Sequence, residues 1–218
     1  MEEEYYAYIR KWFKKWAPIY DLVDIFISGV RDKVVDFTDA RNGSKILDVA
    51  AGTGKQTFAF AKRGFVVEGI DLSEDMLKVA NRKNKYGNAK FQVADATNLP
   101  FEDKYFDVSC ISFALHDMPF TIREKVLKEM GRVTNSKGMI VIVDYALPVN
   151  KIGRYLIYHV VKSYESKYYP EFVTSDIRAL VRKSGIELEE EHPVLLGAGR
   201  IFKGIRMGST SARSLIRK

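Results

Sequence analysis

The chain has 218 residues, 46% of them hydrophobic, which is enough to bury the core of a single domain. No run is long and apolar enough to cross a membrane, no signal-peptide pattern is present, and the single cysteine, Cys110, excludes a disulfide framework, so a reducing, cytoplasmic setting is expected. The formal net charge of +7 is uneven, because basic residues gather in the first helix and from Arg200 onward, and this distribution would suit peripheral contact with an anionic membrane surface.

Apolar residues recur with the spacing of alternating helices and strands. Residues 3–39 are expected to form two helices divided at Ala17-Pro18, because proline begins a helix more readily than it continues one. The expected strands then cover 45–50, 65–70, 90–94, 106–112, 138–144, 186–192 and 195–204. The expected helices between them cover 55–63, 73–84, 121–134, 153–169 and 174–183. This alternation predicts an α/β fold with a doubly wound parallel sheet and helices on both faces.

A glycine turn follows the first expected strand. The segment Lys45-Ile-Leu-Asp-Val-Ala-Ala-Gly-Thr-Gly54 ends an apolar run in an acid, Asp48, and a second apolar run ends at Asp71, 23 positions later. Open α/β sheets bind ligands beyond the carboxyl ends of their strands. The turn glycines let a ligand approach the backbone, and Asp71 can bind the two hydroxyls of a ribose. These features predict a nucleoside pocket.

The spacing excludes two other nucleotide motifs. A dinucleotide fingerprint needs a third glycine or an alanine where this chain has Thr57. A phosphate-binding P-loop needs a glycine where it has Val49 and a hydroxyl residue where it has Gln56. The acid at the turn also suits a ligand that carries an ammonium group better than one that carries a pyrophosphate.

The stretch from Asp48 to Gly54 resembles the acid-first loop of the class I S-adenosylmethionine methyltransferases, D-x-G-x-G-x-G, with Ala50 in the first glycine position. The ubiquinone/menaquinone-biosynthesis C-methyltransferases commonly carry Asp-Val-Ala-Gly-Gly-Thr-Gly here, so the resemblance is closest to that branch. Leu99-Pro100-Phe101 and the strand from Phe106 resemble further motifs of the family in the expected order.

The resemblance implies a Rossmann-like sheet of seven strands with the last one antiparallel. It also implies one methyltransferase domain over residues 1–207. Within it, 1–40 would form an N-terminal helical lid, 45–145 the cofactor-binding core and 148–173 a substrate-side insert. Residues 208–218 would be a flexible basic tail.

The cofactor implied is S-adenosylmethionine. Met76 would either lie over the adenine or simply pack within its helix. In the family an acid and the next backbone N–H, here Asp95 and Ala96, recognise the adenine edge. Tyr20, in Trp16-Ala-Pro-Ile-Tyr20-Asp21, resembles a tyrosine that closes the site over the cofactor. The full set of expected cofactor residues is Tyr20, Asp48, Ala50, Gly52, Thr53, Gly54, Asp71, Leu72, Met76, Asp95, Ala96, Ser112 and Phe113.

His116 is the candidate general base, because it follows the fourth strand at the active-site edge and imidazole titrates near neutral pH. The alternative is an imidazole that only stacks on a neighbour or caps a helix. Tyr20 is a second candidate at the reacting centre. No metal site is expected. Arg200 is expected in the turn between the last two strands, where it would orient an anionic substrate or remain a surface residue.

The methyl acceptor remains open between several classes. A small molecule with a quinone or phenolic ring carbon leads, and an amine or phospholipid headgroup is the nearest alternative. An RNA methyltransferase is disfavoured because no appended RNA-binding module or target-amine motif is present. A non-catalytic cofactor-binding subunit is the last alternative.

Overall fold

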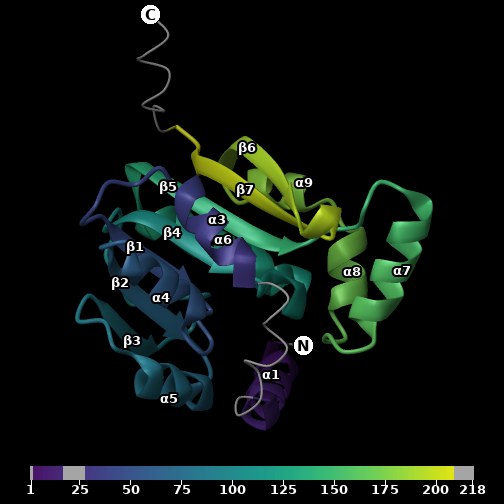
Figure 1. Ribbon diagram of the computed structural model, residues 1–218, viewed down its shortest axis with the longest axis horizontal. Coiled ribbons are helices and arrows are strands. Elements are labelled where there is room, and N and C mark those ends of the chain that lie inside the picture. The colour runs from purple at the N-terminus through teal and green to yellow at the C-terminus, as the bar shows by residue number, and fades with distance from the viewer. Residues whose placement is uncertain (1, 17–27, 209–218) are drawn as a thin grey trace, which may run out of the picture.

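Seven strands form one mixed sheet in the order β3-β2-β1-β4-β5-β7-β6 (Figure 1). The computed structural model describes residues 2–16 and 28–208. The strands are β1 (Lys45–Val49), β2 (Val66–Asp71), β3 (Ala89–Val93), β4 (Phe106–Ser112), β5 (Thr134–Tyr145), β6 (Ile186–Val194) and β7 (Gly199–Arg206). The α/β fold with seven strands is therefore confirmed.

The first five strands are parallel, and β7 runs antiparallel to both β5 and β6. Strand β1 lies between β2 and β4 and is buried from Ile46 to Val49, as expected of a central parallel strand covered on both faces. Because these strands share a direction, their carboxyl ends meet at one edge of the sheet. The expected site residues follow those ends.

Helices cover both faces of the sheet (Figure 1). The described helices are α1 (Glu2–Trp16), α3 (Ser28–Phe37), α4 (Lys55–Lys62), α5 (Glu74–Lys83), α6 (Phe120–Val133), α7 (Lys151–Lys162), α8 (Tyr169–Thr174) and α9 (Ile177–Lys183), with short 3-10 turns η2 (Leu115–Asp117) and η3 (Leu195–Gly197). Ile46 packs in the core beneath α3 and α4, whereas Leu47 packs in the core that includes α6 and α9. Because successive side chains of a strand point to opposite faces of the sheet, they pack into two separate cores, one on each face.

In the C-terminal half, the expected bounds of one helix and one strand were wrong. The single helix expected over 153–169 is instead α7, a turn, and the short helix α8, with α9 following from Ile177. Ser166 accepts the backbone N–H of Tyr168 on its hydroxyl, an example of a serine side chain competing with helical hydrogen bonds. Pro170 then sits in the first turn of α8, where proline is tolerated.

The last expected strand also begins later than the apolar pattern indicated. Leu195 and Leu196 have positive φ values of 52° and 54° and form the turn η3, so β7 starts at Gly199. Arg200 therefore lies inside β7 rather than in the turn, and its guanidinium is 2.9 Å from the Glu191 carboxylate. This ion pair gives Arg200 a structural contact within the sheet.

Among residues 2–16 and 28–208, no helix combines the length and apolar character needed to span a membrane.

Candidate functional site

A large cavity opens at the carboxyl edge of β1, β2, β3 and β4. Its volume, counted together with the open solvent at its mouth, is ≈ 1010 Å³. The cavity wall contains Asp48, Ala50, Gly52, Thr53, Asp71, Leu72, Met76, Asp95, Ala96, Ser112 and Phe113. The structure therefore brings together all the expected cofactor residues except two. Gly54 lies outside the wall, and Tyr20 lies outside the described residues.

The turn after β1 exposes its backbone to the cavity. Gly52 has a φ of +54°, and a Cβ built there would lie 3.3 Å from Met76 Cε, so only a glycine leaves this wall open. Ala50 has a φ of +55° in the same left-handed region, which costs about 1 kcal/mol for a residue with a Cβ. Phe113, at the end of β4, is also left-handed, with a φ of +49°. Strained backbone at a cavity wall is typical of ligand sites.

Gly54 supports the turn from behind. With a φ of +83°, it precedes α4, and a Cβ there would lie 2.7 Å from Phe91 and 2.9 Å from Phe58. Its role is therefore close packing of the turn against the sheet.

Asp48 is buried at the base of the cavity and is only 1% exposed. Burial is the main cause that raises the pKa of Asp48 to about 7, although a hydrogen bond of 2.5 Å from the Thr57 hydroxyl opposes this rise. On α4, the Gln56 side-chain oxygen also lines this region and is buried with no hydrogen-bond partner among the described residues. Both oxygens suit a ligand that brings hydrogen-bond donors or positive charge.

Asp71 is held in a fixed orientation at the end of β2. One carboxylate oxygen accepts the Gly52 N–H at 2.8 Å, and the other accepts the Ser73 N–H at 2.8 Å. Burial raises the pKa of Asp71, and these hydrogen bonds oppose the rise. A carboxylate oxygen accepts more than one hydrogen bond, so Asp71 retains acceptor capacity toward the cavity.

Helix α1 contributes a wall of the cavity that the motifs did not reveal. Tyr5, Ile9 and Phe13 recur at helical spacing and line the cavity, and the Tyr6 hydroxyl lies 3.2 Å from the Thr97 hydroxyl after β3. The spacing of these apolar side chains was a detectable signal, since i, i+4 and i+8 lie on one helix face. It indicated a buried face without indicating the cavity behind it.

The turn between α7 and α8 packs on α1. Lys167 forms an ion pair of 2.9 Å with Glu4, and the rings of Tyr5 and Tyr8 meet the Tyr168 ring edge-on at 5.9 and 6.0 Å. Two segments far apart in sequence thus pack together, and of the two α1 lines the cavity.

His116 lies in η2, behind the cavity rather than on its wall, and is only 2% exposed. Its Nδ1 is 2.7 Å from Asp144, and its Nε2 is 3.2 Å from Glu165. Burial by itself would lower the pKa of His116, but the three surrounding carboxylates outweigh burial and raise that pKa well above its usual value. An imidazole that already carries a proton is a poor acceptor, so this geometry gives no support to the general-base role, which stays a prediction.

The acidic partners of His116 were missed by the sequence reasoning. Asp144 ends β5 beside β4, and Glu165 belongs to the turn between α7 and α8. Asp117 lies next to His116 and also lines the cavity. The contact with Asp144 was accessible in principle, because parallel neighbouring strands place their carboxyl ends together. The contact with Glu165 depends on how the turn between α7 and α8 folds back, and no local sequence pattern predicts that.

This chain is similar in sequence to known proteins. A family described as a methyltransferase domain matches residues 46–138. A demethylmenaquinone methyltransferase of Paenarthrobacter aurescens is 40% identical over 149 residues, and the match covers 66% of this chain but only 57% of that protein. A ubiquinone/menaquinone biosynthesis C-methyltransferase UbiE of Ectopseudomonas mendocina is 32% identical over 229 residues, covering 89% of this chain and 87% of that protein.

Solved structures agree on the fold. The magnesium protoporphyrin IX methyltransferase of Synechocystis, solved with bound S-adenosylhomocysteine, has a TM-score of 0.72 and covers 92% of this chain and 99% of that one at 18% identity. This structure has the same fold as the chain, and the Ectopseudomonas protein matches nearly its full length in sequence. The chain belongs to the ubiquinone/menaquinone-biosynthesis C-methyltransferase family, a branch of the class I S-adenosylmethionine-dependent methyltransferases.

Proposed function

We propose that this chain is an enzyme that transfers the methyl group of S-adenosylmethionine to a ring carbon of a small quinol-type or phenolic acceptor. The observation that carries the proposal is the single cavity that gathers the acid-first loop, Asp71, Met76 and the Asp95-Ala96 pair at one sheet edge. The ring-carbon acceptor follows the names of the curated relatives. Those names favour it over amine, phospholipid-headgroup or RNA acceptors and over a non-catalytic subunit.

The residues of the cavity fit the cofactor from end to end. Asp71 would accept the ribose hydroxyls, and Met76, which lies beside Gly52, would contact the adenine face. Asp48 and the unpartnered oxygen of Gln56 suit the ammonium end of the ligand. The cofactor supplies the electrophilic methyl group, and the protein supplies alignment and exclusion of water.

The remaining wall suits a flat apolar acceptor. Phe13, Phe113, Met118, Ile122 and Val126 line the cavity and offer aromatic and aliphatic contacts rather than charge. Such walls bind a ring through apolar contacts, and a small number of polar groups set its orientation.

We propose one domain spanning residues 1–207, in which 1–40 form the lid, 45–145 the cofactor core and 148–173 the acceptor-side segment. Tyr20 in the lid and His116 behind the cavity remain predicted participants, and 208–218 remains a proposed flexible tail.

Calorimetry with S-adenosylhomocysteine tests the cofactor site. Replacing Asp71 with asparagine should weaken binding about 10- to 100-fold, because a charge-assisted hydrogen bond to each ribose hydroxyl is lost. Glu68→Gln, three residues earlier on the same strand and off the cavity wall, is the matched control and should bind normally. Equal affinity in the Asp71 and Glu68 variants would contradict the site.

A transfer assay tests the acceptor. The purified chain is given S-adenosylmethionine with a labelled methyl group and, in parallel, a reduced demethylmenaquinone analogue, a simple phenol, and phosphatidylethanolamine. The proposal expects label on the ring carbon of the quinol, located by mass spectrometry. Label only on nitrogen would establish the amine alternative instead, and cofactor binding with no transfer to any acceptor would favour the non-catalytic subunit.

We also propose a cytoplasmic enzyme that touches anionic membrane surfaces through α7. The side chains of Ile152, Tyr155, Leu156 and Val160 on this helix are all more than half exposed. Lys151, Arg154 and Lys162 on the same helix are exposed and basic. An apolar helix face flanked by cations is the usual form of an interfacial helix. The one cysteine, Cys110, is a buried free thiol, in keeping with a reducing compartment.

A further inference from the structure

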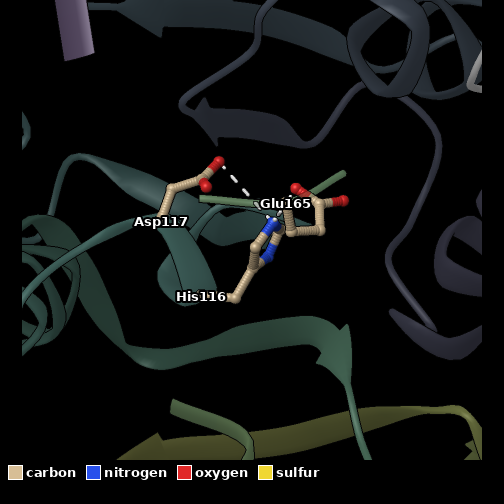
Figure 2. Close-up of side chains that lie close together, drawn as sticks. All are labelled: His116, Asp117 and Glu165. Carbon is tan, nitrogen blue, oxygen red and sulfur yellow. Dashed lines mark hydrogen bonds and ion pairs between the residues drawn. The ribbon is translucent and has the colours of Figure 1, made fainter. Parts of the chain in front are cut away.

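The cluster behind the cavity wall has the composition of a metal site. His116, Asp117 and Glu165 each direct one ligand-type atom to a common point, and these three atoms lie within 4.8 Å of one another (Figure 2). His116 Nε2 is 3.2 Å from Glu165 Oε2 and 3.6 Å from Asp117 Oδ2. A tetrahedral ion with bonds of about 2.0–2.1 Å separates its ligand atoms by about 3.3 Å. The two spacings from Nε2 are close to that value, and the third pair of ligand atoms lies within 4.8 Å.

The surrounding groups orient these ligands as the outer shell of a metal site does. Asp144 lies 2.7 Å from His116 Nδ1 and thereby directs Nε2 toward the other two residues. The Tyr145 hydroxyl donates to Glu165 Oε1 at 2.8 Å, which leaves Oε2 facing the imidazole. A carboxylate on the far side of a ligating histidine is the commonest such arrangement.

Asp117 supplies an independent sign of a missing ligand. The residue is only 6% exposed, and its carboxylate presents Oδ2 to His116 (Figure 2), whereas its other oxygen, Oδ1, has no hydrogen-bond partner among the described residues. A buried carboxylate oxygen without a partner is costly.

Charge within the cluster points to a cation as well. Three carboxylates surround one imidazole, and the nearby Arg123 is committed to the Leu115 carbonyl and to Glu171. The cluster therefore contains more carboxylates than one imidazole can neutralise.

We propose that His116, Asp117 and Glu165 bind a divalent first-row transition metal ion, of which Zn²⁺ and Mn²⁺ are the representatives. One imidazole nitrogen with two carboxylates favours these ions over Mg²⁺ and Ca²⁺, which prefer oxygen ligands alone. Three protein ligands leave a coordination position for water or an oxygen of the acceptor. Glu165 belongs to the turn between α7 and α8, and His116 and Asp117 belong to η2, so the ion would also link that turn to η2.

Asp117 belongs to both the cluster and the cavity wall, so the ion would stand at the acceptor end of the proposed active site. Metal binding itself does not depend on methyl transfer. It is measured on the untagged full chain, stripped of metal with a chelator, so failure of the metal site and failure of the proposed function are separate results.

Calorimetric titration with ZnCl₂ and MnCl₂ should give one ion per chain. Glu165→Gln and Asp117→Asn, which keep shape and volume, should each weaken binding at least about tenfold, because each removes an anionic ligand. Titration with CoCl₂ should give a visible absorption band in the parent chain that both variants lose. Unlike His116→Ala, these two substitutions leave the buried imidazole in place, and circular dichroism checks that each variant is folded.

His159→Ala is the matched control, because His159 is an exposed histidine on α7 that contacts the rings of Tyr155 and Tyr158 and not the cluster. It should bind like the parent chain, and Zn²⁺ should raise the melting temperature of both. The proposal is overturned if the parent chain binds neither ion, if both folded cluster variants bind as tightly as it does, or if His159→Ala weakens binding as much as they do.

Discussion

At the residue scale, burial of Asp48 changes its pKa, and this change affects both stability and ligand binding. Its carboxyl group sits under the glycine turn, where water does not solvate the charge, and its pKa rises to about 7. The folded state therefore binds a proton more tightly than the unfolded state does. The resulting contribution to stability is present at low pH and is lost as pH rises from about 4 through 7.

The same shift predicts a pH dependence of cofactor binding. Ionised Asp48 attracts the ammonium group of S-adenosylmethionine, whereas protonated Asp48 does not, so affinity should rise with pH and level off above 7. Below that pH the loss should approach tenfold per pH unit. Calorimetry between pH 5.5 and 8 measures it, with Asp48→Asn as the control that should bind more weakly with a flat profile. An unchanged slope in Asp48→Asn would assign the pH dependence to another group.

At the scale of elements, the turn between β1 and α4 depends on Gly54, which lies outside the cavity wall. Gly54→Ala should destabilise the fold by about 2 kcal/mol or more, because the residue has a left-handed backbone and its Cβ would overlap Phe91 and Phe58. Gly131→Ala is the opposite case, since Gly131 lies within α6 and a Cβ there meets nothing within 4 Å. It should stabilise by up to about 1 kcal/mol through helix propensity.

Urea unfolding of both glycine variants measures these differences. The order expected is Gly131→Ala, parent, Gly54→Ala, from most to least stable. A Gly54→Ala protein as stable as the parent would show that the turn can shift away from Phe91 at little cost.

The elements that the sequence predicted well are those with local signals. Strands β1, β2 and β4 are apolar runs, and their bounds agree with the expected ones within one residue. The loops that follow them carry the cofactor residues, so the cavity was predictable once parallel strands were inferred. By contrast, the break between α7 and α8 and the turn η3 have no comparable signal. Glu165 reaches His116 only because that break reverses the chain, so the acid–imidazole cluster could not be predicted.

At the scale of the whole molecule, apolar and charged surfaces are distributed unevenly. Within the described part of the chain, α7 stands at the periphery, with α8 between it and the sheet (Figure 1). Ile152 is 76% exposed and Leu156 is 55% exposed, and they lie four residues apart on one helix. Side chains at this spacing share a face, and an apolar face this exposed needs a partner.

Vesicle binding tests whether that partner is a membrane. The parent chain should sediment with vesicles that mix phosphatidylcholine and phosphatidylglycerol, and less with phosphatidylcholine alone, because Lys151, Arg154 and Lys162 favour anionic headgroups. Replacing both Ile152 and Leu156 with serine should weaken binding at least about tenfold by removing two apolar contacts.

Two comparisons distinguish this membrane contact from nonspecific adsorption to vesicles. Val66→Thr changes an apolar side chain that is 51% exposed at the start of β2, away from α7, and should leave vesicle binding intact. Added salt should weaken the parent's binding, because it screens the basic residues but not the apolar contacts. If the double serine variant binds both kinds of vesicle as the parent does, α7 has another partner, and a second copy of the chain becomes the candidate to examine by sedimentation. Cofactor affinity should be the same in all of these variants, since neither α7 nor Val66 lines the nucleoside end of the cavity.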